Sequence, residues 1–132
     1  MENEYKLLSY VENFFSKLMA ASGASKNWFV NNYPSEIDKG WKDMIFVDLN
    51  PQNDRDAYTF GSASIYLYSK PTGKLYRKDL KAMLAMEQKL QKAIEGSEDE
   101  HYVIGEVNWR DTGFDKDAQF FYNIINVQVI IK

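Results

Sequence analysis

Two stretches of the chain repeat apolar residues at steps of three and four, which predicts two amphipathic helices. The first covers residues 7–19 and is followed by Gly23, which suits the left-handed position after a helix. The second covers residues 74–96 and has Gly96 as its C-terminal cap. The predicted buried stripes are Leu7, Leu8, Val11, Phe14, Phe15, Leu18 and Met19 in the first helix, and Leu80, Met83, Leu84, Leu90 and Ile94 in the second.

Five other segments have the patterns of β-strands. The segment 43–51 is apolar on both faces, which is typical of a central strand. The segment 60–69 alternates, with alanine, isoleucine and leucine on one face and serine and tyrosine on the other. The last strand has one apolar face and one mixed face, and the mixed face needs a cover. The predicted strands are 27–34, 43–51, 60–69, 101–109 and 119–131.

The order of these elements, α-β-β-β-α-β-β, predicts one α+β domain over residues 1–132 with an antiparallel-rich sheet. A chain of 132 residues can bury a core of its own, and no repeat or linker interrupts it. The absence of cysteine excludes disulfides and thiolate chemistry. The acidic start is not that of a signal peptide, and no apolar run has the length of a membrane span, so we expect a cytoplasmic protein.

The late triplet Asp111-Thr112-Gly113 spells the active-site motif of aspartic proteases. The resemblance to the retroviral members of that family covers these three residues alone. In that family the triplet lies early in the chain and precedes a small residue, whereas here it lies late and precedes Phe114. Threonine and glycine suit turns, and Gly113 can take positive φ. We therefore predict a turn between the last two strands and no protease activity.

Other groupings of polar residues do not predict catalysis. Glu98, Asp99 and Glu100 adjoin the single histidine, His101, but consecutive residues point in different directions, so a solvated loop is favoured over a metal site. Lys74, Arg77 and Lys78 near a helix start could hold an anion, although exposed basic residues are the norm. An enzyme would need a carboxylate such as Asp48 or Glu106 on a strand. We expect no enzyme, no metal and no cofactor.

Charge is distributed unevenly along the second half of the chain. Residues 74–95 contain six basic and three acidic residues, whereas residues 96–118 contain seven acidic and two basic ones. Two unlike surfaces can meet head-to-tail between copies, and such contacts close into rings when the rotation permits. The alternative is ordinary surface charge without a partner. The expected contact residues are Lys74, Arg77, Lys78 and Lys81 on the basic side, and Asp111, Asp115 and Asp117 on the acidic side.

The layout resembles a known family. A strand of the type "SIYLYSKPT" leads into a helix of the type "LYRKDLKAMLAMEQKLQKAIEG", and two strands ending in "FFYNIINVQVIIK" close the chain. This pattern is similar to the tail-terminator and tail-completion proteins of long-tailed bacteriophages. The resemblance is one of pattern and size, and it implies a non-enzymatic subunit that forms a ring, of about six copies, on a tail or neck. The partners would be further copies and other tail or neck proteins, in the host cytoplasm or the virion.

The aromatic content of 15% supports an alternative function. A sheet face carrying Tyr66 and Tyr68, with Trp28 or Trp41, could bind a peptide, a glycan or a single-stranded nucleic acid by stacking. The net charge of −3 argues against nucleic acid, because phosphate binding favours a basic surface. Aromatic residues also fill the cores of their own domains, which is the more common use.

Overall fold

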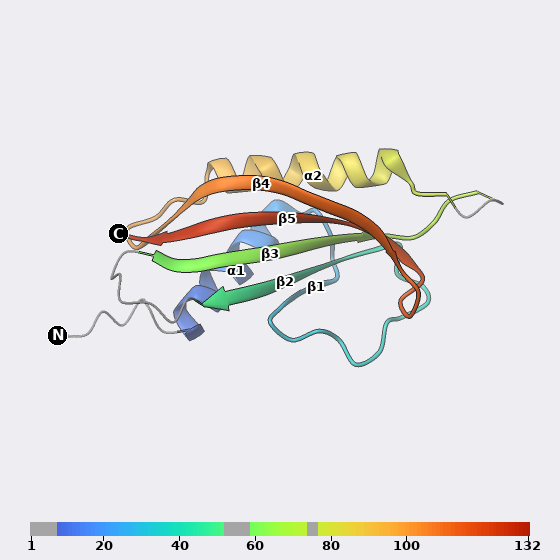
Figure 1. The fold of residues 1–132 in the computed structure, drawn as a ribbon, viewed down its shortest axis with the longest axis horizontal. Helices are drawn as coiled ribbons and strands as arrows, with labels where there is room; N and C mark the ends of the chain where they lie inside the picture. Colours follow the sequence, from blue (N-terminus) through green and yellow to red (C-terminus); the bar gives the residue numbers. More distant parts are fainter. Residues whose placement is uncertain (1–7, 52–58, 74–76) are drawn as a thin grey trace.

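A computed structural model describes residues 8–51, 59–73 and 77–132 of the chain. These residues form two α-helices and one five-stranded, mainly antiparallel sheet, so the predicted α+β class is confirmed (Figure 1). The elements in chain order are α1 (Leu8–Ser22), β1 (Trp28–Val30), β2 (Asp43–Pro51), β3 (Thr59–Ser69), α2 (Leu80–Glu95), β4 (Tyr102–Asp115) and β5 (Phe120–Ile131).

The strands lie in the order β1-β2-β3-β5-β4, and the described strands pair antiparallel except for β1 with β2. Both helices pack on the same side of the sheet, which we call the helix face (Figure 1). The opposite side, which we call the aromatic face, carries Met44, Phe46, Tyr66, Tyr68 and Tyr122. The helix face carries Ile45, Val47 and Leu49 of β2, together with the apolar sets predicted for β3 and β5: Ala63, Ile65, Leu67, Ile125, Val127, Val129 and Ile131.

Helix α1 forms because its apolar residues repeat at the helical period and meet the sheet on one side. The side chains of Val11 and Phe15 are fully buried, and Gly23 follows the helix at φ 61°, as predicted. Asn31 follows β1 in a left-handed conformation, and its side-chain amide links β2 to α1. Its Oδ1 accepts from the Leu49 amide at 2.9 Å, and its Nδ2 donates to Glu12 at 3.2 Å.

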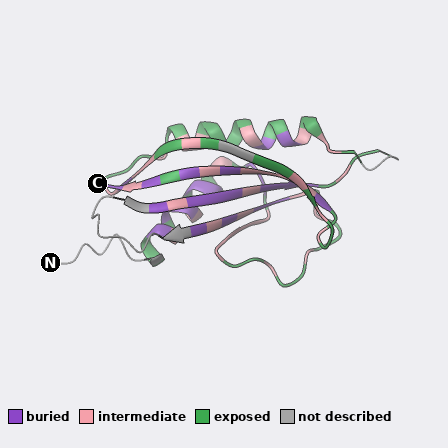
Figure 2. Cartoon of the chain, in the orientation of Figure 1, coloured by how far each residue is buried: buried purple, intermediate pink, exposed green. Residues whose placement is uncertain are grey.

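Helix α2 begins later than the sequence predicts. Asp79 caps it, because its carboxylate accepts the Ala82 amide at 3.0 Å, and Arg77 instead pairs with Thr72 through two backbone hydrogen bonds. Met83, Met86 and Leu90 form the buried stripe. Much of α2 is exposed (Figure 2). The predicted burial of Leu80 and Leu84 is wrong, because these side chains are 70% and 53% exposed.

The predicted turn at Asp111-Thr112-Gly113 is also wrong. These residues lie inside β4 and pair with Ile124, Asn123 and Tyr122 of β5. The connection lies further along, at residues 116–119, where the Asp115 carboxylate accepts the amides of residues 117 and 118 at 2.9 and 3.0 Å. Gly113 does not have a positive φ. A glycine suits this position because a side chain would collide with Tyr122. A Cβ there would lie 2.6 Å from the Tyr122 hydroxyl and 2.7 Å from the ring carbon that bears it.

Candidate functional site

A continuous set of aromatic rings crosses the middle of the aromatic face. Tyr66 on β3 lies 6.0 Å from Phe46 on β2 and 6.1 Å from Tyr122 on β5, measured between ring centroids. Tyr68 lies 5.7 Å from Tyr122 and 6.3 Å from Phe120. These residues come from three neighbouring strands. They lie on the same face because every second residue of a strand points to the same side of the sheet. The rings form a second small core, separate from the one under the helices.

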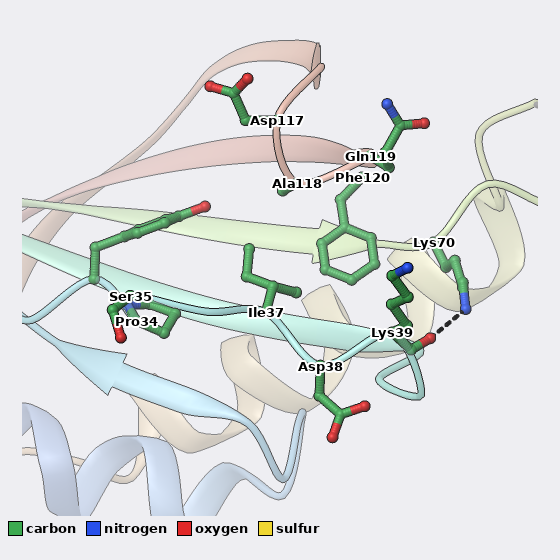
Figure 3. Close-up of a pocket in the computed structure, with 11 residues that line it drawn as sticks. Pro34, Ser35, Ile37, Asp38, Lys39, Lys70, Asp117, Ala118, Gln119 and Phe120 are labelled. Carbon is green, nitrogen blue, oxygen red and sulfur yellow. Dashed lines mark hydrogen bonds between the residues drawn. The ribbon is translucent and has the colours of Figure 1, made fainter.

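The segment 31–42, which connects β1 to β2, covers part of this face. Tyr33 packs on Phe46 with a centroid distance of 5.3 Å, and Trp41 packs on Phe29 at 5.8 Å. Between this segment and the β4–β5 connection lies a pocket of about 480 Å³ (Figure 3). Its lining residues are Tyr33, Pro34, Ser35, Ile37, Asp38, Lys39, Lys70, Asp117, Ala118, Gln119 and Phe120.

Two tyrosine hydroxyls beside the pocket have altered acidity. Burial raises the pKa of Tyr68 above its ordinary value, and the neighbouring Tyr33 and Asp115 raise it further. Burial and then Asp115 also raise the pKa of Tyr33, while a hydrogen bond with Tyr68 lowers it in part. Both hydroxyls therefore stay protonated at neutral pH, and each can donate a hydrogen bond.

Of the binding face proposed from the sequence, Tyr66 and Tyr68 with Trp28 or Trp41, the structure brings Tyr66, Tyr68 and Trp41 to one side of the sheet and Trp28 to the other. Tyr68 is 5% exposed, so its ring belongs to the second core rather than to an open platform. Trp28 packs against the core on the helix face, whereas Trp41 and Tyr66 belong to the aromatic face. Trp28 is directed away because β1 pairs in register with β2, where its partner Ile45 also points to the helices. Tyr66 and Trp41 are half-buried.

The residues proposed for contacts between copies fall into different environments. Arg77 and Lys81 are exposed, and Lys74 lies outside the described residues. Asp111 and Asp115 pair with Ile124 and Phe120 and so project from the aromatic face, and Asp117 follows in the connection. Helix α2 with its basic residues and the acidic side chains of β4 therefore lie on opposite sides of the sheet. The helix start is not an open anion site, because the Asp79 carboxylate occupies it.

Lys78 is half-buried, and its ammonium group bonds to other parts of the same molecule. Its ammonium group donates to Thr112 Oγ1 at 2.6 Å and to Asn123 Oδ1, and the Asn123 amide donates in turn to Glu87 at 2.5 Å. These bonds link the start of α2 to β4 and β5. A substitution of Lys78 would therefore disturb the fold as well as any contact between copies.

We expect Lys78→Met to lower the free energy of unfolding by about 1 kcal/mol, since a charge-assisted hydrogen-bond network at a partly exposed site would be lost. Urea unfolding followed by circular dichroism measures this change. Lys81→Met is the matched control, because Lys81 is exposed three residues further along, in the first turn of α2, and it should change stability by less than about 0.5 kcal/mol. Equal effects of the two substitutions would contradict the proposed role of the network.

The acidic segment before β4 has structural roles. The Asp99 carboxylate accepts the backbone amides of His101 and Tyr102 at 2.7 and 2.8 Å, and Glu98 forms an ion pair with Lys132 at 2.6 Å. Within the described ranges, no three carboxylate or imidazole groups come together in a way that could hold a metal ion. The carboxylates considered for acid–base chemistry do not converge: Asp48 pairs with Ser64 in the middle of the sheet, and Glu106 is exposed in an irregular part of β4.

Sequence reasoning missed the pocket itself. Ile37 and Phe120 contribute to its wall, yet they come from parts of the chain 83 residues apart. No local pattern signals their proximity, because it depends on the path of the segment 31–42 across the sheet. Phe120 follows the connection between β4 and β5, and its burial could have been inferred only if the position of that connection had been known.

Neither helix that the structure describes combines the length and the apolar character needed to cross a membrane. The chain matches no protein-family model, and no curated protein is significantly similar to it in sequence.

Proposed function

We propose that the chain is a structural subunit of a phage or prophage, which assembles with copies of itself into a ring at the end of a tail tube or at the neck. The layout of helices and strands, which resembles that of tail-terminator and tail-completion proteins, supports this proposal by analogy of pattern. The observation that carries it is the presence of two unlike surfaces on opposite sides of one sheet. The subunit would lie in the host cytoplasm or in the virion, without an enzymatic role.

The first surface is the outer side of α2. Leu80 and Leu84 are one helical turn apart and expose their side chains, so together they form a small apolar area at the surface. Arg77 and Lys81 are exposed beside them. A small apolar area with basic residues at its margin is the composition expected of a contact between proteins.

The second surface lies on the other side of the sheet, along β4 and its connection to β5. Asp111 and Asp117 are exposed there, and Asp115 is half-buried. The neighbouring Ile124 is half-buried on the same face, so this surface also mixes apolar and acidic groups. Its charge is opposite to that of the margin of α2.

A contact between these surfaces would be heterologous, because they lie on opposite sides of the sheet and one two-fold contact would have to bring both into the same interface. A growing arc of copies then has one free surface of each kind, one at either end, until the last copy closes the ring. Opposite charges would favour this association and make it sensitive to ionic strength. Other tail or neck proteins would contact the finished ring.

We expect light scattering behind a sizing column to give a native mass of about six times the 15.4 kDa of the chain at low ionic strength. The mass should fall as salt is added. The double substitution Arg77→Glu and Lys81→Glu should shift the protein toward the monomer, by weakening association about tenfold or more. Lys78 is left unchanged in this test because it has a role within the fold.

The double substitution Lys89→Glu and Lys92→Glu is a matched control, since it reverses the same number of charges at exposed positions of α2 further from Leu80. A single 15.4 kDa species at every protein and salt concentration would contradict the ring. Equal weakening by the control would show that net charge, and not this surface, governs association.

Loss of the gene from its phage should give tails without a defined end, which electron microscopy would detect.

A second candidate function is a binding module on the aromatic face. The observation that favours it is the pocket between the segment 31–42 and the β4–β5 connection. The pocket shares Asp117 with the acidic surface proposed for assembly, whereas it shares no residue with the outer side of α2.

A further inference from the structure

Strand β4 has a free edge. It is the last strand in the order β1-β2-β3-β5-β4, and among the strands that the structure describes it pairs with β5 alone. From Asp111 to Asp115 its register with β5 continues without a shift, so this stretch is a regular strand. Asp111, Thr112 and Phe114 are exposed there. Backbone groups on the open side of such a strand can pair with a further strand.

A projecting arm precedes α2. The arm consists of residues 70–73 and 77–79, which in Figure 1 leave the body of the molecule beyond the end of β3 and return to the start of α2. Thr72 and Arg77 hold its two sides together, because their backbones exchange two hydrogen bonds, at 2.8 and 3.1 Å. Thr72, Gly73 and Arg77 are exposed. The arm is therefore a short extended ladder that projects beyond the sheet.

The arm and the edge of β4 have opposite charge. The residues of the arm include three basic side chains and one acidic one, whereas residues 111–117 include three acidic side chains and one basic one. The ammonium group of Lys78 is engaged within its own molecule, whereas the exposed guanidinium of Arg77 can meet an acidic group of a neighbouring copy. Opposite charges favour a contact between the arm and the strand over a contact of either element with itself.

The arm and the free edge lie at the same end of the molecule. Lys78, at the base of the arm, donates to Thr112 Oγ1 at 2.6 Å, so the arm leaves the body beside the stretch Asp111–Asp115. Copies in a ring are related by rotation about one axis, and their equivalent ends therefore lie at the same level along that axis. The arm of one copy can then reach the edge of β4 in the next copy without a shift along the axis.

We propose that the arm of each copy adds to the free edge of β4 in the next copy, where the stretch Asp111–Asp115 receives it as a further strand. The pairing rests on the proposed ring and names the element through which one copy holds the next. Arg77 of the arm meets Asp111, and the exposed side of Phe114 is covered by the neighbouring copy. The contact combines backbone hydrogen bonds with opposite charges, so it is directional as well as sensitive to salt.

Disulfide cross-linking tests the pairing, because the chain has no cysteine of its own. The Thr72→Cys variant is mixed at high salt with a size-tagged Asp111→Cys or Phe114→Cys variant, transferred to low salt and oxidised with glutathione disulfide. These two positions lie on opposite faces of β4, so the arm should come within disulfide reach of one of them. We expect dimers with one copy of each variant, in about fivefold excess over dimers of either variant with itself.

Thr72→Cys mixed with Gln88→Cys is the matched control, since Gln88 is exposed on α2, and it should give no such excess. Adding Arg77→Glu to the Thr72→Cys variant should lower the yield of mixed dimers about fivefold, whereas adding Lys89→Glu should leave it unchanged. Circular dichroism of each variant reports whether its fold is intact.

The outcomes separate the arm from the ring. A closed oligomer in light scattering without mixed dimers at either position of β4 would overturn the pairing of the arm and leave the ring in place. Equal cross-linking to Gln88→Cys would also overturn the pairing, because the arm would then have no preferred partner. A monomer at every protein and salt concentration would overturn the arm and the ring together.

Discussion

Leu90→Ala is expected to lower the free energy of unfolding by about 2–5 kcal/mol, the range for truncation of a fully buried leucine that leaves a cavity. Leu90 is 0% exposed and belongs to the core between α2, α1 and the sheet. Interiors are close-packed, and the neighbouring side chains cannot fill the space left by three carbon atoms without strain. Urea unfolding monitored by circular dichroism, with an unchanged m-value, would measure the loss.

Leu84→Ala is the matched control on the same helix. Its side chain is 53% exposed, so the substitution should change stability by no more than about 0.5 kcal/mol. The same substitution removes part of the apolar area proposed for contact between copies, and it should reduce the native mass in light scattering. A loss of stability equal to that of Leu90→Ala would mean that α2 packs through the stripe expected from the sequence.

Gly113→Val is expected to destabilise the protein by about 3 kcal/mol, at the upper end of the range for overpacking. The new Cβ would overlap the Tyr122 ring, which cannot simply turn away because it is packed against Tyr66 and Tyr68 at centroid distances of 6.1 and 5.7 Å. Valine otherwise suits a strand, so the loss would come from this contact and not from backbone preference. Thermal unfolding would show the change.

The Tyr122→Ala background provides the control for this prediction. Once the ring is absent, Gly113→Val should have little further effect or should stabilise β4, so the two substitutions should be coupled by about 2 kcal/mol. Additive effects in the double variant would contradict the account of Gly113. They would point instead to a conformation at this position that only glycine adopts.

The α+β class and much of the main core follow from local patterns. The alternation in β3 and the wholly apolar face of β5 place Ile65 and Val127 on one side of the sheet whatever the order of the strands, because successive residues of a strand point to opposite sides. The stripe of α1 is equally unambiguous, since its apolar residues form one band. In β3 and α1 one face is much more hydrophobic than the other, so only that face can be buried against the rest of the protein.

Helix α2 lacks that simplicity. Leu80 and Leu84 form one apolar row, and Met83 and Met86 lie on an adjacent one, so the period alone admits more than one buried side. The rotation of the helix is settled by contact with α1 and β3, which the sequence does not display. The predicted start of α2 was also wrong. Arg77 pairs with Thr72 and Asp79 caps the helix, so the helix begins at Leu80 and not at residue 74.

The sequence by itself determined the elements, the apolar faces of the strands and the uneven distribution of charge. The tertiary structure alone decided the separation of the basic helix from the acidic strand, the burial of Tyr68 and the pocket between Ile37 and Phe120. Periodicity fixes which side of an element is apolar, because it depends on neighbours in the chain. Which surfaces meet depends on contacts between distant segments, and here the path of residues 31–42 across the sheet decides them.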